Sequence, residues 1–270
     1  MSALVLGAVA YDAKVVPIWD GFQRWFATRG LDFDYVLYTN YEKQVEAHLA
    51  GQIDVAWNSP LAWLESIRAA PHATTVAMRD TDQDLTSVIV ARPGTQLSDV
   101  RRIGVGAGDS PQATLIPLLD LAESGIEPEV VRHDVLVGKH GDHIGGERDA
   151  VRALLRGEVD AAAILDGNLM GFQKDGTLPA GAVEVIRQTG RYDHCNFTVL
   201  HDDPAMGHPA IGRFTELLLG MKFADPVVRP LMELEGLTEW RPGRTSGYAL
   251  LERAIDRFGT IEPWLRRVRG

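Results

Sequence analysis

The sequence has little cysteine and no long apolar segment, and each shortage excludes a class of protein. Cys195 is the one cysteine among 270 residues, so an internal disulfide is excluded and the redox compartment stays open. No segment offers the roughly 20 consecutive apolar residues that a membrane-spanning helix needs. We therefore expect no membrane insertion.

Positive charge is also in short supply. The chain has 27 Lys and Arg residues against 37 Asp and Glu, which gives a formal net charge of −10 and a pI of about 5.3. General nucleic-acid binding needs a basic face and is excluded on this balance, whereas a local cationic pocket is not. The hydrophobic fraction of 45% and the charged fraction of 24% are typical of a soluble globular protein.

The first apolar stretch, residues 3–10, lacks the preceding Lys or Arg of a secretory signal. We expect it to be the first core strand, and we expect the chain as given to be cytoplasmic. A periplasmic or secreted protein whose signal had been removed would begin in the same way.

One phrase occurs twice in the chain. The segment 49–56 reads LAGQIDVA, and the segment 155–162 reads LRGEVDAA. Each copy predicts a helix end, a Gly stop and a short buried strand, because Gly accepts the left-handed backbone that closes a helix. A polar loop follows each strand. Two matching helix–strand units indicate two similar lobes.

The order of expected elements predicts an α/β fold with two lobes and two hinge strands. Strands and helices alternate in both halves, the run 85–92 crosses to the second lobe, and the run 196–200 returns to the first. This order is typical of the type II periplasmic-binding-protein-like fold, with a ligand cleft between the lobes. We expect lobe one to comprise 1–88 with 192–270, and lobe two 89–191.

Among the individual elements, an amphipathic helix is expected over 15–29 and another helix from about residue 111 to 124. The C-terminal part is expected to be mainly helical, over 208–221, 226–235 and 247–258. Residues 240–244 are expected to form a surface loop.

The sequence resembles the PhnD-like phosphate/phosphonate-binding proteins of ABC transporters over nearly its whole length. The resemblance rests on the motifs GQIDVAWNSP at 51–60, SVIVARPGT at 87–95 and RDAV at 148–151. It also includes EGL at 235–237 and the pair Gly247-Tyr248. It implies a binding protein that closes two lobes on a small anion and works with a transporter permease.

Two positions depart from the family pattern. Where the family has a Ser-Thr-Ser-Gly run that holds the phosphonate, this chain has Ser110-Pro111-Gln112-Ala113, which keeps one hydroxyl, at Ser110, and loses the N–H donor at Pro111. The family histidine before the repeat helix is replaced by Arg148. Arg can bind a carboxylate or a phosphate through two parallel hydrogen bonds. The change therefore favours a planar carboxylate as the ligand more than the family pattern does, relative to a phosphonate.

The candidate ligand-binding residues follow the ends of expected strands, because ligands of open α/β sheets bind there. Arg148, Ser110, Gln112 and the helix starts near 59 and 110 are expected to hold the acid group. Tyr11, Tyr38 and Trp57 are expected to pack against the rest of the ligand. The full set is Tyr11, Lys14, Tyr38, Trp57, Asn58, Ser59, Ser110, Gln112, Arg148, Asp166 and Asn168.

Several of these residues also have a structural interpretation, whereas for Asp166 and Asn168 only a ligand role is expected. Lys14 offers a cation to the cleft, but the segment before the first helix is also where capping occurs. Tyr38 can be a packed core residue. Asn58 or Ser59 can be a helix cap. Asp166 and Asn168 can hold a ligand ammonium or hydroxyl.

Metal binding and nucleophilic catalysis have little support in the sequence. Lys139, His140 and His143 lie in a Gly-rich stretch without a clear third ligand, so no metal and no cofactor is predicted. Cys195 is expected to be a small apolar filler, because His194 as its strand neighbour would point to the opposite face.

The sequence therefore predicts a binding protein for a small phosphonate, phosphate or carboxylate. The alternative is a cytoplasmic enzyme on the same fold, with dehydratase or lyase chemistry on a carboxylated metabolite. Its acid or base would be Asp12, Asp166, His140 or His143. No nucleophile–base pair supports that alternative directly.

Overall fold

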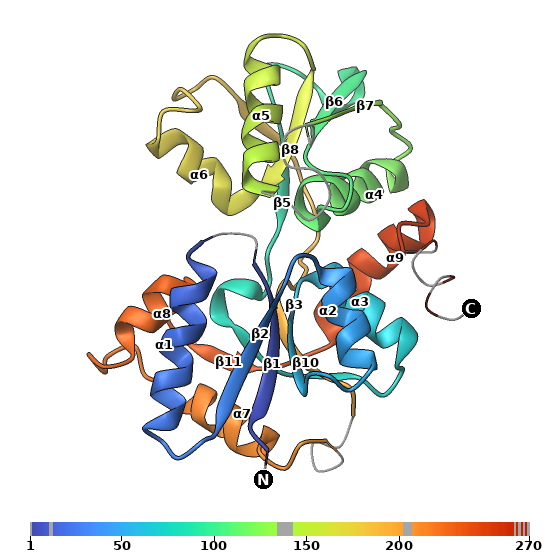
Figure 1. Ribbon diagram of the computed structural model, residues 1–270. Helices are drawn as coiled ribbons and strands as arrows, with labels where there is room; N and C mark the ends of the chain where they lie inside the picture. The colour runs from blue at the N-terminus through green and yellow to red at the C-terminus, as the bar shows by residue number, and fades with distance from the viewer. Residues whose placement is uncertain are drawn as a thin grey trace. The chain divides into compact units, whose positions relative to one another are not determined.

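The computed structural model describes residues 2–10, 13–133, 143–201 and 207–261, and near the C-terminus residues 263, 266 and 268. The chain forms two compact units (Figure 1). Unit 1 comprises 1–83, 193–248 and 261–270, and unit 2 comprises 84–192 and 249–260. The chain passes between the units at 83–84 and at 192–193, and the segment 249–260 belongs to unit 2.

Unit 1 is built on a six-stranded mixed sheet in the order β11-β4-β10-β3-β1-β2. The first three strands, β1, β2 and β3, are parallel, and the return strand β10 is antiparallel to β3 and β4. The strands are β1 (Leu4–Val9), β2 (Phe33–Tyr38), β3 (Val55–Asn58), β4 (Thr74–Arg79), β10 (Asn196–Val199) and β11 (Trp240–Pro242).

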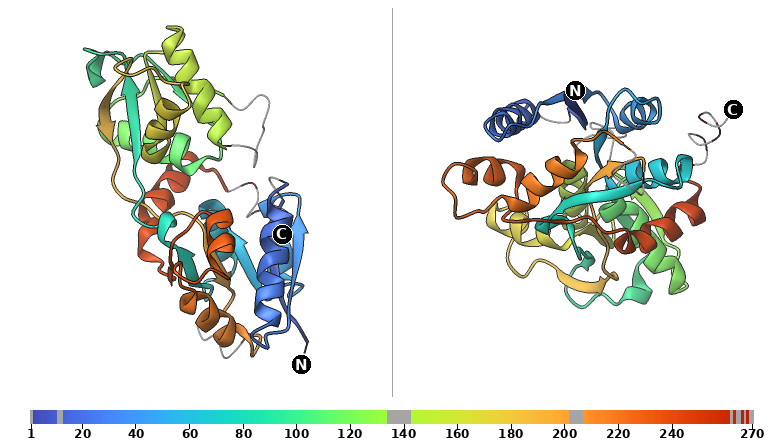
Figure 2. Two further views of the ribbon diagram at one scale, coloured as in Figure 1. Left: turned by 90° about the vertical axis from the view of Figure 1, so that its left-hand side faces the viewer. Right: turned by 90° about the horizontal axis from the view of Figure 1, so that it is seen from below.

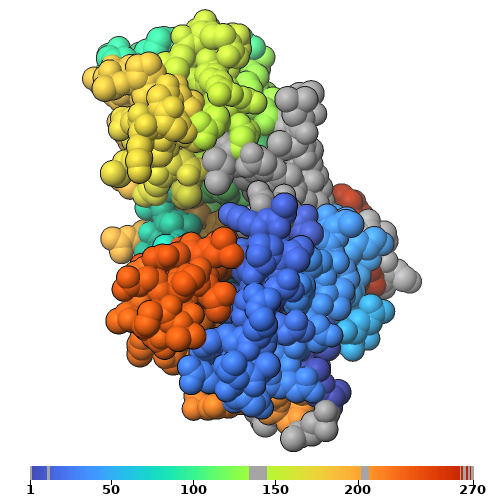
Figure 3. Space-filling model, turned by 60° about the vertical axis from the view of Figure 1, so that its left-hand side comes forward, coloured from blue at the N-terminus to red at the C-terminus, as the bar shows by residue number. Residues whose placement is uncertain are grey.

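Helices cover both faces of this sheet (Figures 1 and 2). On one face lie α1 (Val15–Ala27), α7 (Ile211–Gly220) and α8 (Arg229–Glu235), and on the other lie α2 (Tyr41–Leu49) and α3 (Pro60–Ala69). The predicted apolar face of α1 is confirmed, since Ile18, Phe22, Trp25 and Phe26 are all buried. The helix α8 packs beside α1, as the surface view also shows (Figure 3).

Unit 2 has a five-stranded sheet in the order β7-β6-β8-β5-β9. The strands are β5 (Ser87–Ala91), β6 (Arg102–Val105), β7 (Glu129–Arg132), β8 (Ala161–Leu165) and β9 (Glu184–Gln188). The helices α5 (His143–Leu155) and α6 (Asp166–Lys174) cover one face, and α4 (Ile116–Glu123) covers the other. The helix α9 (Ala249–Phe258) packs on α4, with an ion pair between Arg253 and Glu123 at 3.1 Å. This contact explains why 249–260 belongs to unit 2.

The repeated phrase has the predicted structure in both copies. Gly51 and Gly157 have φ angles of 69° and 76°, the left-handed region that glycine adopts without a steric cost. In each copy the next residue donates its N–H back to the helix, at 3.0 Å in both cases. This bond is typical of a Schellman ending.

The aspartate of each copy has a structural task that the sequence did not reveal. Asp54 accepts a hydrogen bond from the Val5 N–H at 2.8 Å, which fixes the start of β1. Asp160 accepts bonds from the N–H groups of Arg101 and Arg102, both at 2.9 Å, which fixes the start of β6. The repeat therefore attaches its own strand to the neighbouring parallel strand of the same sheet, β1 in unit 1 and β6 in unit 2.

One local prediction was wrong. Residues 240–242 form the strand β11, in which Trp240 is 2% exposed, and not a surface loop. The helix expected from about residue 111 to 124 is present, with a π-helical turn over Pro111–Leu115 followed by the α-helix Ile116–Glu123. No helix among the described residues is long and apolar enough to cross a membrane.

The helices before the two copies differ at one equivalent position, which is His48 in α2 and Leu154 in α5. Both side chains are buried. Burial lowers the pKa of His48 from 6.5 to about 4, so the folded state gives up a proton that the unfolded chain binds. The resulting stability is complete above pH 6.5 and is lost as the pH falls towards 4.

We expect His48→Leu to remove this pH dependence, since the second copy already has leucine at the same place. Between pH 7 and pH 4 the wild type is expected to lose about 3 kcal/mol more free energy of unfolding than His48→Leu. Urea unfolding at a series of pH values measures the difference. The exposed His72→Gln serves as the control and should follow the wild type. Parallel curves for wild type and His48→Leu would contradict the assignment.

Candidate functional site

The carboxyl ends of the parallel strands bring polar residues to one edge of each sheet. In unit 1 this edge is formed by the ends of β1, β2, β3 and β4 and by the start of β10. In unit 2 it is formed by the ends of β6, β7, β8 and β9 and by the start of β5. We call these the carboxyl edges. They are where ligands of open α/β sheets bind.

At the carboxyl edge of unit 1, Asn58 is fully buried and its amide is fully occupied. Its Nδ2 donates to Ser66 Oγ at 3.2 Å and to Thr198 Oγ1 at 2.9 Å, and its Oδ1 accepts from Gln44 Nε2 at 2.8 Å. Ser59 caps α3 by accepting from the Ala62 N–H at 3.3 Å. Ser59 thus has the capping role that was the alternative to ligand contact, whereas Asn58 is held by a buried hydrogen-bond network that was not predicted.

The other predicted residues of unit 1 differ in their surroundings. Trp57 is 5% exposed and packs in the core, with its ring 4.6 Å from that of Phe197. Tyr38, at the end of β2, is half-buried, and burial raises its pKa. Lys14 is exposed at the start of α1. Tyr11 lies outside the described residues.

At the carboxyl edge of unit 2, Ser110 and Gln112 occupy the start of the π-helical turn. Ser110 is fully buried, and its Oγ accepts from the Ala113 N–H at 3.2 Å. Gln112 is 6% exposed, and its Oε1 has no hydrogen-bond partner among the described residues. A buried polar atom without a partner is costly unless a ligand or water satisfies it. The structure therefore leaves an open hydrogen-bonding position at the predicted loop.

A cation that was not among the predicted site residues lies beside this loop. Arg132 is the last residue of β7, and its guanidinium lies against Gly108, in the loop that leads to Ser110. The side chain is exposed, and none of the ion pairs between described residues includes it. Strand pairing could have indicated it, because Arg132 is in register with Val105 at the end of β6.

A buried cluster of hydroxyl groups, also not predicted, lies under the same loop. Ser87 Oγ donates to the carbonyl oxygen of Gln112 at 2.6 Å and lies 2.7 Å from Tyr192 Oη. The Ser87 N–H donates to Thr189 Oγ1 at 2.9 Å. These bonds fix the backbone of the loop from below. Burial raises the pKa of Tyr192, so its phenol stays protonated.

The predicted acidic side of unit 2 is assembled as well. Asp166 Oδ2 accepts from Thr86 Oγ1 at 2.5 Å. Asn168 Nδ2 donates to Glu147 Oε2 at 2.8 Å, and Glu147 is fully buried. Two carboxyl groups therefore lie near the end of β8, which suits a ligand group that donates hydrogen bonds.

Arg148 does not have the expected surroundings. Its Nη1 donates to Asp175 Oδ2 at 2.6 Å and to Thr177 Oγ1 at 2.5 Å, and its guanidinium lies 4.9 Å from the centre of the Phe172 ring. Hydrogen bonds from Thr177 and then from Arg148 lower the pKa of Asp175 to about 2. The charge of Arg148 is thus already matched within unit 2. The argument for a planar carboxylate, which rested on a free Arg148, loses its support.

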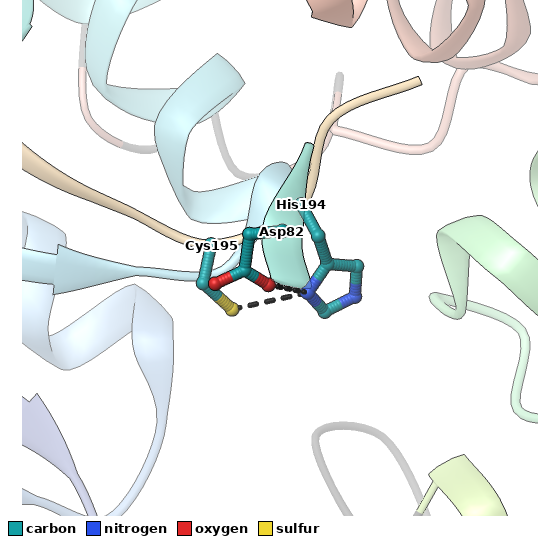
Figure 4. Close-up of side chains that lie close together, drawn as sticks. All are labelled: Asp82, His194 and Cys195. Atoms are coloured by element: carbon teal, nitrogen blue, oxygen red, sulfur yellow. Dashed lines mark hydrogen bonds and ion pairs between the residues drawn. The ribbon is translucent and has the colours of Figure 1, made fainter. Parts of the chain in front are cut away.

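The prediction that His194 points away from Cys195 was wrong. Both residues precede β10 rather than lying within it, so strand alternation does not apply. His194 Nδ1 lies 3.1 Å from Cys195 Sγ and 3.4 Å from Asp82 Oδ1 (Figure 4). Burial raises the pKa of the Cys195 thiol well above its ordinary value, which disfavours a nucleophilic thiolate. Lys139, His140 and the side chain of His143 lie outside the described residues.

The chain matches a family model over residues 8–248, and that model describes the periplasmic substrate-binding protein of a phosphonate ABC transporter. The chain belongs to this phosphonate-binding family. The membership supports a binding protein over the enzyme alternative, and the PhnD-like resemblance is confirmed. No curated protein sequence matches the chain.

Solved structures with the same two-unit fold support the assignment of fold. PhnD1 from Prochlorococcus marinus, in complex with methylphosphonate, has a TM-score of 0.69 and 16% identity. The match covers 96% of this chain and 98% of that one. A phosphonate-transporter binding protein from Pseudomonas aeruginosa has a TM-score of 0.61 and 13% identity, with coverage of 95% and 86%. A Xanthomonas citri protein bound to ATP has a TM-score of 0.67 and 16% identity, with coverage of 100% and 98%.

We expect Arg148→Gln to affect stability rather than ligand binding. The substitution removes the bonds to Asp175 and Thr177 and the contact with Phe172, so the melting temperature should fall. The dissociation constant for a small anion that the wild type binds should stay within about three-fold, as measured by calorimetry. A loss of about ten-fold or more in affinity would return Arg148 to the ligand site.

Proposed function

We propose that this protein captures a small oxyanion of the phosphonate class for uptake by an ABC transporter. The observation that carries the proposal is the position of Arg132 beside the loop to Ser110, in a chain of the phosphonate-binding family. A guanidinium can bind two oxygens of a phosphonate or carboxylate at once. A helix start adds free N–H groups and the positive end of the helix dipole.

The acid group of the ligand is proposed to lie between Arg132, Ser110 and the Gln112 amide. Gln112 contributes one unmatched polar atom, and its amide can present either the oxygen or the N–H₂ group. Pro111 supplies neither an N–H nor a hydroxyl, so this loop has fewer donors than the family's hydroxyl run. Phosphonate, phosphate and carboxylate therefore all remain candidate ligands. Calorimetry can separate them.

The rest of the ligand is proposed to carry a hydrogen-bond donor, such as an ammonium or hydroxyl group. Asp166 and Glu147 place carboxyl oxygens near the end of β8, on the strand adjacent to β6 in the same sheet. Ligand contacts by Tyr38, Trp57 and Lys14 stay predictions, and so does the closing of the lobes on the ligand.

We expect the purified protein to be stabilised by methylphosphonate, phosphate or a small carboxylate, since a ligand that binds only the folded state raises the melting temperature. Arg132→Gln and Ser110→Ala should each weaken binding of the active compound about ten-fold or more, because each removes a charge-assisted hydrogen bond. Ser98→Ala, on an exposed residue at the amino end of β6, is the matched control.

The outcomes of this test are distinct. Binding that survives both Arg132→Gln and Ser110→Ala would move the ligand site away from this loop. A carboxylate that binds and is then consumed during incubation would favour the enzyme alternative. The absence of any thermal shift across the panel would contradict the proposed function.

The proposed partner is a membrane permease with its ATPase, and the proposed location is outside the cytoplasm, as the description of the family as periplasmic supports. The liganded protein should stimulate ATP hydrolysis by the cognate transporter in proteoliposomes several-fold more than the ligand-free protein does. Equal stimulation with and without ligand would argue against a transport role. Arg132→Gln, which should not load with ligand, supplies the matched control.

A further inference from the structure

We infer that Asp82, His194 and Cys195 form a binding site for a thiophilic divalent cation such as Zn²⁺. Among the described residues these three offer a carboxylate oxygen, an imidazole nitrogen and a thiol sulfur within 4.8 Å of one another (Figure 4). They belong to unit 1, whereas the proposed anion-binding loop belongs to unit 2. The inference is independent of the proposed function.

Two distances between the ligand atoms are close to those of a tetrahedral zinc site, and the third is within 4.8 Å. Zinc binds sulfur at about 2.3 Å and imidazole nitrogen at about 2.0–2.1 Å, which places neighbouring ligand atoms about 3.3–3.6 Å apart. His194 Nδ1 is 3.4 Å from Asp82 Oδ1 and 3.1 Å from Cys195 Sγ. A coordinating metal also removes the thiol proton, which burial otherwise retains.

The backbone holds these residues in place without any ion. The His194 N–H donates to the Asp82 carbonyl oxygen at 2.8 Å, and Tyr248 Oη donates to the His194 carbonyl oxygen at 2.8 Å. Asp82 and Cys195 are 2% and 7% exposed, whereas the side chain of His194 is 22% exposed. Access is therefore from the side of His194, and water would take the fourth position of an open site.

Arg79 is the group that opposes a cation here, and its own contacts limit that effect. Arg79 donates to both oxygens of Asp82, at 2.5 and 3.0 Å, and to the carboxyl group of Glu235 at 3.3 Å. The Glu235 carboxyl can therefore offset the charge of Arg79, and the two hydrogen bonds from Arg79 orient the Asp82 carboxylate. Outer hydrogen bonds of this kind are common around metal-binding carboxylates.

The test uses the whole chain after treatment with a chelator and dialysis. Titration with Co²⁺ should give a thiolate-to-cobalt charge-transfer band at one equivalent, and Zn²⁺ should displace it. Cys195→Ser should abolish the band. His194→Gln should weaken Zn²⁺ binding at least about ten-fold. His72→Gln, an exposed histidine of the same unit, is the matched control and should bind like the wild type.

Folding of the variants is checked by the melting temperature in the presence of chelator. In the wild type, excess Zn²⁺ should raise the melting temperature, and in Cys195→Ser it should not. A cobalt spectrum without a thiolate band would overturn the inference, as would equal Zn²⁺ affinity in wild type and a folded Cys195→Ser. Binding that is lost in His72→Gln would place the ion elsewhere and would also overturn it.

Discussion

The hydrogen bonds of Asn58 hold together parts of unit 1 that are remote in the sequence. The amide donates to Thr198 across 140 residues and accepts from Gln44 of α2. From Thr198 the network continues to Asn196 and then to Tyr248, whose hydroxyl donates to His194. Each of these groups is buried, so losing one partner leaves an unsatisfied polar atom at a cost of about 1–3 kcal/mol. The return strand β10 is thereby fixed against β3.

This constraint explains the character of the unit 1 carboxyl edge. Its polar side chains look like ligand contacts in the sequence, because they follow a strand and begin a helix. In the structure the side chains of Asn58 and Ser59 form hydrogen bonds with other groups of the protein. The same network fixes the backbone at His194, and so it also positions the candidate metal ligands. One hydrogen-bond network therefore stabilises the fold of unit 1 and also positions the candidate metal ligands.

Unit 2 uses the same framework but leaves more of its edge open. Ser87 and Tyr192 support the loop from below, much as Asn58 supports its own edge. Above that support, the Gln112 amide keeps an unmatched oxygen, and Arg132 brings a positive charge to the loop. The two copies of the repeat thus build equivalent strands, while the residues at their edges have diverged. That difference favours unit 2 as the source of the acid-binding groups.

The sequence by itself determined the local structure that repeats. Gly51 and Gly157 accept the left-handed backbone that ends a helix, and the spacing of apolar residues in α1 indicates a buried face. Both features were predicted from neighbours along the chain. Family motifs over most of the chain were also readable. What only the tertiary structure decided depends on contacts between distant segments. Arg148 was predicted to bind the ligand, yet it forms an ion pair with Asp175. Asp82 was not among the predicted residues, yet it lies in contact with His194. Hydrogen bonds and ion pairs act over 3 to 4 Å, and strand pairing, rather than sequence spacing, sets which side chains come that close.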